Sequence, residues 1–234
     1  MMRTIVIATI KRWNLSNARA LRKKLAGKWR VRIVSKPASL TARMLERLAP
    51  RYVFFPHWSW MIPEEIYSTH ECVVFHMTDL PFGRGGSPLQ NLLARGIRRT
   101  KVSALRAGNG ADTGPVYFKR PLDLSDGSAD EMLSAASGVV FNEMIPELLR
   151  RQPAPKPQRG RPVLFSRRKP RDSDIAVAGL ETPAALYDFI RMLDGEGYPA
   201  AFLSAGGFRF EFRRAVKDGD IVRGVFEVKK DERK

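Results

Sequence analysis

Short, continuously apolar runs alternate with segments of helical spacing along the first two thirds of the chain. Apolar runs of about four to eight residues predict strands that are buried on both faces. The runs expected as strands lie at residues 3–10, 31–35, 51–58, 71–77, 101–107 and 115–124. The last two flank the loop sequence GNGADTG, so we expect these two strands to pair with each other.

Helices are expected between these strands, wherever apolar residues recur three or four positions apart. They lie at about 16–28, 39–49, 87–97 and 128–151. Ser16 is the expected N-cap of the first helix, and Ser39 or Thr41 of the second. Ser128 and Glu131 have the spacing of a capping box, which predicts the start of the long last helix.

Strands and helices that alternate in this order favour a parallel sheet with helices on both faces. The expected fold class is therefore α/β, with a Rossmann-like, mostly parallel sheet and a small C-terminal α+β appendage. In such sheets, ligands bind at the carboxyl ends of the strands. His57 and His76 both lie at predicted strand ends of this kind, which places a candidate site there.

The chain is expected to divide into a first domain over residues 1–150, a linker over 151–162 and a small subdomain over 163–234. The linker sequence, RQPAPKPQRGRP, is basic and rich in proline, which favours an extended chain. The last part carries an amphipathic helical pattern followed by two alternating strand patterns. It is too small to hold a large core alone, so it should pack on the first domain.

The net charge is +17, from 41 Lys and Arg against 24 Asp and Glu. Such an excess attracts polyanions, which include nucleic acid, anionic membrane surfaces and phosphorylated small molecules. Because the basic residues are spread along the chain, a need for solubility explains the charge about as well. The charge alone does not identify a partner.

No apolar stretch approaches the roughly 20 residues that cross a bilayer, so no membrane insertion is expected. The only cysteine, Cys72, lies in an apolar run and is expected in the core. A lone cysteine fits a reducing compartment, and we expect a cytoplasmic protein. No His, Cys and Asp residues cluster at metal-ligand spacing, so no metal is expected.

The segment from His76 to Pro88 follows the apolar run CVVF and is rich in glycine and proline. Such residues allow a tight loop whose backbone N–H groups face a ligand. A second loop, GNGADTG, carries Asp112. A histidine at a strand end, met by a carboxylate from elsewhere in the chain, is typical of a proton-transfer pair. On the residues alone, Asp112 could equally be a turn-forming aspartate.

Together the two loops resemble the N10-formyltetrahydrofolate-dependent formyltransferases, which act on methionyl-tRNA, glycinamide ribonucleotide or nucleotide sugars. The chain reads H-x-x-x-L-P-F-G-R-G-G-S-P from His76 and Asp-Thr-Gly from Asp112, as the two elements of their signature do. PHWSWMIPEEI is similar to the stretch that lines their pterin pocket. LYDFIRMLDGEGYPAAF is similar to a segment that follows their catalytic core.

The resemblance implies that residues 1–150 form a formyltransferase catalytic domain. Its activity would be the transfer of a formyl group from the co-substrate N10-formyltetrahydrofolate to a primary amine. His76 and Asp112 would be catalytic, with Asp112 orienting His76 and favouring its charged form. The residues expected to bind the folate are Trp58, Trp60, Met61, Pro81, Gly83, Arg84 and Gly85.

One departure from the family concerns the position two residues before the histidine, where the family has Asn and this chain has Val74. By resemblance, that Asn donates a hydrogen bond to the formyl oxygen as negative charge develops on it. Loss of one such donor costs about 3–4 kcal/mol. Because valine cannot donate, His57, at the end of the neighbouring strand, is our candidate substitute. The alternative is that His57 is only packed beside Trp58 and Trp60.

The acceptor that we expect is a nucleotide-linked amino sugar, as used in surface glycan biosynthesis. Its phosphates suit the abundant Arg and Lys, and the C-terminal part is shorter than in the tRNA enzymes. A tRNA acceptor is the first alternative and would explain the charge. A second alternative, suggested by Val74, is a catalytically inactive module that binds folate or nucleic acid. A homodimer is also compatible with the sequence.

Overall fold

The structure is a computed structural model that describes residues 2–231, and these residues form two compact units. Of the described residues, unit 1 comprises 2–84, 100–122 and 134–164, and unit 2 comprises 85–99, 123–133 and 165–231. The chain thus passes between the units several times, where the sequence predicted one linker over 151–162. Each unit is described here by itself.

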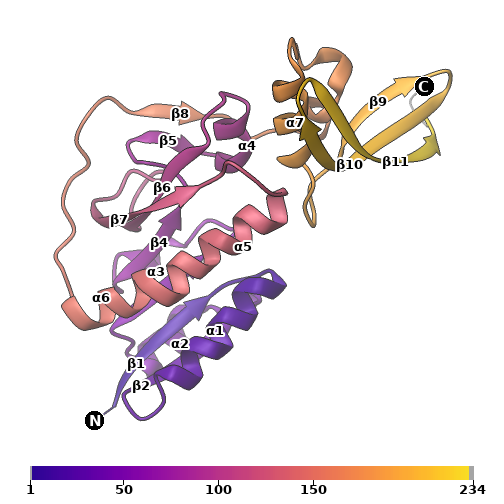
Figure 1. Ribbon diagram of the computed structural model, residues 1–234. Helices are drawn as coiled ribbons and strands as arrows, with labels where there is room; N and C mark the ends of the chain where they lie inside the picture. Colours follow the sequence, from indigo (N-terminus) through magenta and orange to yellow (C-terminus); the bar gives the residue numbers. More distant parts are fainter. Residues whose placement is uncertain (1, 232–234) are drawn as a thin grey trace. The chain divides into compact units, whose positions relative to one another are not determined.

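Unit 1 is built on a six-stranded sheet with the order β2-β1-β3-β4-β6-β7 (Figure 1). The strands are β1 (Arg3–Ala8), β2 (Trp29–Val34), β3 (Tyr52–Pro56), β4 (Cys72–His76), β6 (Arg99–Arg106) and β7 (Val116–Asp123). β1 runs parallel to β2 and β3, and β3 runs parallel to β4, whereas β6 is antiparallel to β4. The mostly parallel α/β sheet expected from the apolar runs is confirmed.

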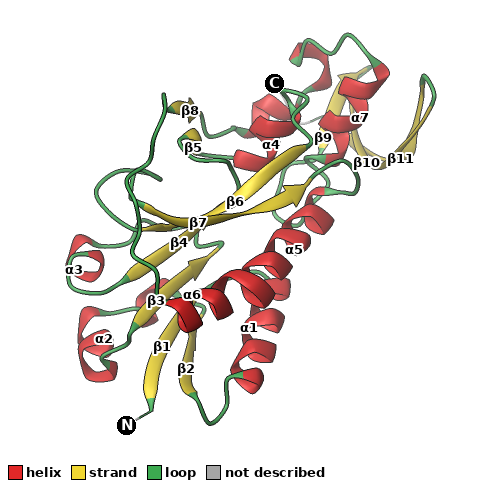
Figure 2. Cartoon of the chain, turned by 60° about the vertical axis from the view of Figure 1, so that its left-hand side comes forward, coloured by secondary structure: helices red, strands yellow, loops and turns green. Residues whose placement is uncertain are grey.

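Helices cover both faces of this sheet (Figure 2). They are α1 (Arg12–Lys24), α2 (Ala42–Leu48), α3 (Glu64–Tyr67), α5 (Ala129–Val139) and α6 (Ile145–Arg151), with a π-helical turn (Val140–Met144) joining α5 to α6. On one face, Leu45 of α2 and Ile66 of α3 pack with Val53 and Phe55 of β3. On α1, Asn17 donates a hydrogen bond to the Ser137 hydroxyl of α5 at 2.8 Å.

Two of the expected helix starts are confirmed and one is wrong. Thr41 caps α2 by accepting a hydrogen bond from the Met44 amide at 3.2 Å. Ser128 and Glu131 form the expected capping box. α1, however, begins at Arg12 without a side-chain cap, so Ser16 lies inside the helix. Its buried face starts with Asn14, whose polarity hid this position from the apolar pattern.

The proline-rich segment after α6 is hydrogen-bonded to unit 1. The backbone of Lys156 exchanges two hydrogen bonds with that of Val116, each of 2.8 Å. The Val163 amide then donates to the Pro81 carbonyl at 3.2 Å. The segment ends in β8 (Val163–Phe165), which pairs with β5 (Phe82–Gly85). These contacts fix the segment against the sheet unit.

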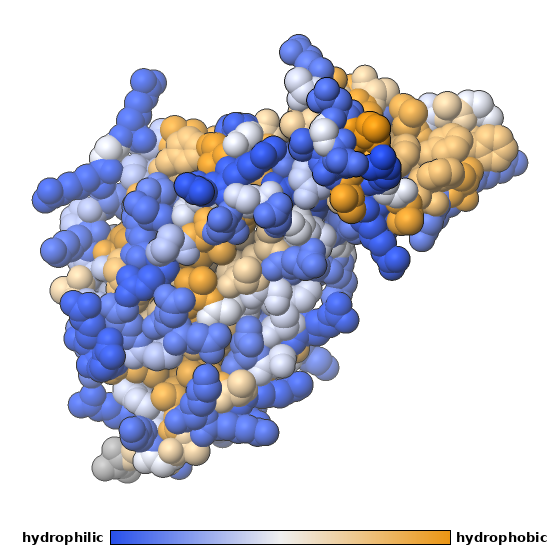
Figure 3. All heavy atoms as spheres, in the orientation of Figure 1, coloured by the Kyte–Doolittle hydropathy of each residue, from blue (hydrophilic) through white to orange (hydrophobic). Residues whose placement is uncertain are grey.

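Unit 2 contains α4 (Pro88–Leu93), α7 (Pro183–Arg191) and a three-stranded sheet with the order β11-β10-β9. The strands are β9 (Ala201–Ala205), β10 (Phe208–Asp218) and β11 (Ile221–Lys230), and they pair antiparallel. This is the small C-terminal α+β part that the sequence predicted. Large apolar side chains are exposed on the β10–β11 hairpin (Figure 3): Phe208, Val216, Ile221, Val225, Phe226 and Val228.

Candidate functional site

The structure brings together the histidine and the aspartate that the sequence singled out. His76 is the last residue of β4, and Asp112 lies in the loop that follows the neighbouring strand β6. Nδ1 of His76 lies 3.4 Å from Oδ2 of Asp112. Both side chains are largely shielded from solvent, with exposed fractions of 8% and 14%. Shielding from water strengthens the electrostatic interaction between them.

The second ring nitrogen of His76 also faces an acceptor. Nε2 lies 2.7 Å from the carbonyl oxygen of Gly83. Because a carbonyl oxygen can only accept, Nε2 carries the proton of this hydrogen bond. A ring with a proton on each nitrogen donates both to Gly83 and to Asp112. The imidazole is thus held at both ring nitrogens. Of its two partners, the Gly83 carbonyl and the Asp112 carboxylate, only the carboxylate can take up a proton.

The loop that carries Asp112 is closely packed against the end of β6. Asp112 adopts the left-handed conformation, with φ of +55°. At Gly114, a Cβ atom would lie 1.8 Å from the carbonyl oxygen of Arg106, so no side chain fits there. Within the loop, the Thr113 hydroxyl donates to the Asn109 carbonyl at 3.0 Å. The conformation of Asp112 is therefore set by its surroundings.

Two lysines anchor the other loop, which begins after His76. Nζ of Lys101 lies 2.9 Å from the Asp79 carboxylate, and Lys119 donates both to this carboxylate and to the Leu80 carbonyl. Burial raises the pKa of Asp79, but the contacts with the two lysines outweigh it and hold the pKa below its usual value. The Leu80–Pro81 peptide bond in this loop is cis.

A cavity of about 170 Å³ in unit 1 opens beside Asp112. Its walls are apolar and aromatic side chains and the glycine-rich loop: Phe55, Trp58, Trp60, Met61, Ile62, Tyr67, Val74, Leu105 and residues 106–108 and 110–114. Trp58 and Trp60 meet edge to face at 4.9 Å. Pockets for whole drug-sized ligands measure roughly 300–1,000 Å³, so this one has room for a single ring system.

The lining fits the flat ring of a folate. Aromatic and aliphatic walls favour a flat apolar ring, and the bare backbone of the loop offers polar groups at its edge. Three residues predicted to bind the folate, Trp58, Trp60 and Met61, lie in this wall with Asp112. Arg106 is the one cationic side chain among the lining residues, and no motif in the sequence marks it.

Other predicted site residues lie elsewhere. The ring of His57 meets that of Trp13 edge to face at 6.5 Å, and His57 is not among the residues that line the cavity. Burial, with a contribution from Lys11, lowers the pKa of His57 to about 4. Its role as a hydrogen-bond donor to substrate stays a prediction.

The residues predicted from the histidine loop are also not part of the cavity wall. They are Pro81, Gly83, Arg84 and Gly85. Gly83 instead accepts the hydrogen bond from His76, and the guanidinium of Arg84 binds the side chain of Gln158. Their contacts with folate stay predictions. Gln158 lies in the proline-rich segment whose composition indicates a linker, so no sequence pattern marked it as a site residue.

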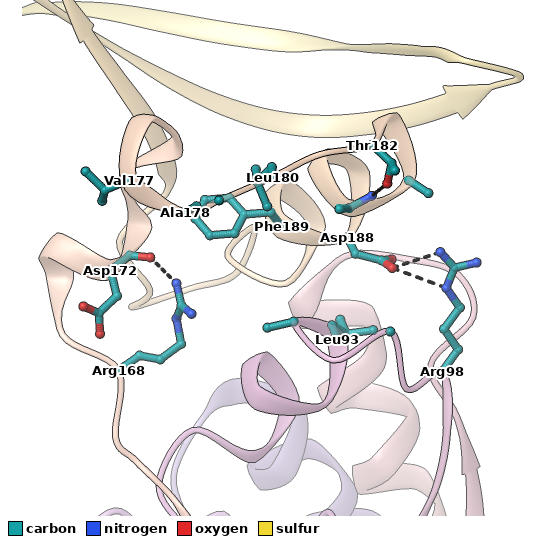
Figure 4. A pocket seen from close by; sticks show the side chains of 15 residues that line it. Leu93, Arg98, Arg168, Asp172, Val177, Ala178, Leu180, Thr182, Asp188 and Phe189 are labelled. Carbon is teal, nitrogen blue, oxygen red and sulfur yellow. Dashed lines mark hydrogen bonds and ion pairs between the residues drawn. The ribbon is translucent and has the colours of Figure 1, made fainter.

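Unit 2 has a cavity of its own, of about 550 Å³ (Figure 4). Arg98 donates to the Asp188 carboxylate at 2.9 Å on one wall, and Arg168 donates to the backbone carbonyl of Asp172 on another. No histidine lines this cavity, and none of the predicted site residues does. The pair that could transfer protons therefore lies in unit 1.

The second half of unit 2 matches a known family model. Residues 170–229 match the C-terminal domain of methionyl-tRNA formyltransferase. Over the chain as a whole, the structure is similar to that of the methionyl-tRNA formyltransferase from Clostridium thermocellum. The TM-score is 0.94 at 47% identity, and the match covers 98% of this chain and 100% of that one.

The chain therefore belongs to the formyltransferase superfamily. Within it, a curated relative is the methionyl-tRNA formyltransferase of Thermodesulfovibrio yellowstonii, 31% identical over 124 residues. That alignment covers 50% of this chain and 40% of the relative, so the chain matches less than half of that enzyme's length. A sugar N-formyltransferase from Shewanella shares the fold, with a TM-score of 0.68 at 13% identity over 93% of this chain and 99% of that one.

Among residues 2–231, none of the helices combines the length and the apolar character needed to span a bilayer. Within the same residues, no three His, Cys, Asp or Glu side chains are grouped so that they could hold a metal ion.

Proposed function

We propose that the protein transfers a formyl group from N10-formyltetrahydrofolate to the amino group of methionyl-tRNA. The observation that carries the proposal is the 47% identity to the Clostridium thermocellum methionyl-tRNA formyltransferase over nearly the whole of both chains. The His76–Asp112 pair beside a cavity with aromatic walls supports the chemistry. The net charge of +17 suits a polyanionic acceptor.

The nucleotide-sugar acceptor that we expected from the sequence is not supported by the relatives. The structural similarity to a sugar N-formyltransferase rests on 13% identity, which reflects the shared fold alone. The expectation relied on the short C-terminal part, yet residues 170–229 of that part match the C-terminal domain of the tRNA enzymes. A role in glycan biosynthesis has no other support in the chain.

When bound, the folate supplies the formyl group, and the residues around the cavity would handle the protons. The attacking amine must lose a proton as its new bond to the formyl carbon forms, and the leaving nitrogen must gain one. Asp112 lines the cavity, where it can accept the proton from the amine and return it to the leaving nitrogen. His76 lies behind Asp112 and can donate a hydrogen bond to it, which stabilises the carboxylate between proton transfers.

The test is to incubate the protein with N10-formyltetrahydrofolate and one of several amines: methionyl-tRNA, or UDP-, dTDP- and CMP-linked amino sugars. We expect formylmethionyl-tRNA, and transfer that weakens steeply as salt rises, because phosphate contacts release counterions. Uncharged tRNA is the control, because any formyl group that it receives cannot be on a methionyl amino group. Transfer to a sugar and not to methionyl-tRNA would refute the acceptor.

Val74 favours a second candidate, a protein that binds folate but does not catalyse transfer. Val74 lines the cavity beside Asp112 and offers no hydrogen-bond donor. If a missing donor limits the reaction, Val74→Asn should raise kcat by roughly 100- to 1,000-fold, the effect of one donor in an oxyanion hole. Folate binding without turnover in both the wild type and Val74→Asn would support the inactive module.

A further inference from the structure

Gln158 lies in the proline-rich segment, and its side chain turns inward. Its neighbours Pro157, Arg159 and Gly160 are exposed, whereas Gln158 is half-buried. Nε2 of Gln158 donates to the backbone carbonyls of Asp112 and Gly114, each at 2.8 Å. It therefore holds the loop of Asp112 on both sides of Thr113.

The other end of the same amide is held by an arginine. Nε and one terminal nitrogen of Arg84 donate to Oε1 of Gln158 at 3.1 and 2.8 Å. Both N–H groups and both lone pairs of the amide are thus used. Since Arg84 can only donate and the two carbonyls can only accept, the orientation of the amide is fixed. A glutamate could still bind Arg84 but would face the two carbonyls without a donor.

This contact connects the two partners of His76. Arg84 directly follows Gly83, whose carbonyl accepts the hydrogen bond from Nε2 of His76. Asp112, whose carbonyl Gln158 binds, contacts Nδ1 of His76 through its carboxylate. The Arg84–Gln158 contact therefore joins the loop on one side of the imidazole to the loop on the other.

The geometry points to Gln158 as a positioning residue for the proton-transfer pair, with Arg84 as its support. By fixing the distance between the two loops, it keeps the Asp112 carboxylate against His76 and beside the cavity. This role rests on the proposed formyl transfer. Displacement of a reacting group by about 1 Å can cost 100-fold in rate, so loss of Gln158 should act on kcat.

The experiment compares the full-length wild type with Gln158→Glu and with the matched variant Gln152→Glu. Gln152 lies in the same segment, and its Oε1 accepts a hydrogen bond from Arg51 at 3.3 Å, away from the site. For Gln158→Glu we expect kcat to fall roughly 10- to 100-fold with KM for methionyl-tRNA kept. Amide hydrogen exchange over residues 108–114 should accelerate, and neither change should occur in Gln152→Glu.

Arg84→Ala and the double variant complete the test. If the two residues act as one support, the losses in kcat should not add in the double variant. Unchanged exchange over residues 108–114 in Gln158→Glu, or an accelerated loop with full kcat, would overturn the positioning role. If the wild type formylates no amine, the proposed function fails, while the exchange experiment still decides whether Gln158 fixes the loop. Unfolding in urea shows whether each variant is folded.

Discussion

Two largely shielded carboxylates, one in each unit, have different partners. Asp188 of α7 in unit 2 lies between two guanidinium groups, from Arg191 at 2.7 Å and Arg98 at 2.9 Å. Asp112 in unit 1 has an imidazole at 3.4 Å and a cavity beside it. The side chains are similarly shielded, with exposed fractions of 6% and 14%.

The difference lies in the partners and not in the burial. An arginine stays protonated at any physiological pH, so Asp188 has two permanent cations as partners. An imidazole, unlike a guanidinium, can both accept and donate a proton, and the His76–Asp112 pair also has a cavity beside it. Arg191 is itself buried and also donates to the carbonyls of Leu124 and Gly127, which makes its contact with Asp188 part of the core.

The largest expected effect comes from breaking the pair in unit 1, and it is on catalysis. Asp112→Asn keeps the shape of the side chain but removes its charge, so kcat should fall by about 100- to 10,000-fold. The free energy of unfolding should change little. The measurement is the rate of formylmethionyl-tRNA formation together with urea unfolding, and His76→Ala should behave alike. A near wild-type rate in either variant would remove the pair from the mechanism.

Breaking the pair in unit 2 should act on stability instead. Asp188→Ala leaves the charge of Arg191 buried without its carboxylate, which should lower the free energy of unfolding by about 3–5 kcal/mol. Asp218→Ala is the matched control, since Asp218 contacts Arg223 at 2.9 Å and both side chains are well exposed. That control should lose less than about 1 kcal/mol. If urea unfolding showed that Asp188→Ala and Asp218→Ala lose equal free energy of unfolding, the structural role of the buried pair would be contradicted.

His57 extends the comparison to a histidine without such a carboxylate contact. Because its pKa is lowered to about 4 by burial and by Lys11, the unfolded chain binds a proton first as the pH falls. The contribution of His57 to the free energy of unfolding is fully present above about pH 6.5. As the pH falls from there to about 4, this contribution is lost, which lowers the free energy of unfolding by roughly 3 kcal/mol. Urea unfolding of the wild type and His57→Ala at several pH values measures it, and the variant should lack this part of the pH dependence.

The smallest expected effect tests how tightly the Asp112 loop is packed. In Gly114→Ala, the new Cβ would overlap the Arg106 carbonyl, so the loop must move. The free energy of unfolding should fall by about 1–3 kcal/mol, and kcat should fall with it. Gly108→Ala is the stability control, since a Cβ there meets no atom within 4 Å. Full activity in Gly114→Ala would show that the loop tolerates displacement.

Much of unit 1 could be predicted because strands β1, β3 and β4 are buried on both faces. The continuously apolar runs located β1, β3 and β4, and cap residues such as Thr41 and Ser128 located helix starts. The apposition of His76 and Asp112 followed from a resemblance to known signatures. From spacing alone, Asp112 could also have been a turn-forming aspartate, because the sequence does not reveal which strand lies next to β4.

The parts that escaped prediction depend on long-range packing of polar groups. The contacts of Gln158 join residues 74 and 46 positions apart, and a glutamine in a proline-rich segment carries no pattern that would announce them. α1 starts at Lys11 and Arg12, which have no capping side chain, so local chemistry could not mark it. The expected sugar acceptor relied on chain length in the C-terminal part, which says little about its fold; residues 170–229 match the C-terminal domain of methionyl-tRNA formyltransferase.

The hydrogen bonds made by the segment after α6 have a consequence for dissecting the molecule. A fragment that stops at residue 150 would contain β1 to β7 and every side chain assigned to proton transfer, yet it would lack Gln158. Such a fragment should bind ligand in the aromatic cavity but turn over slowly. If Gln158 positions Asp112 as proposed, the smallest active piece of this chain extends past α6, into residues that a boundary drawn from composition would discard.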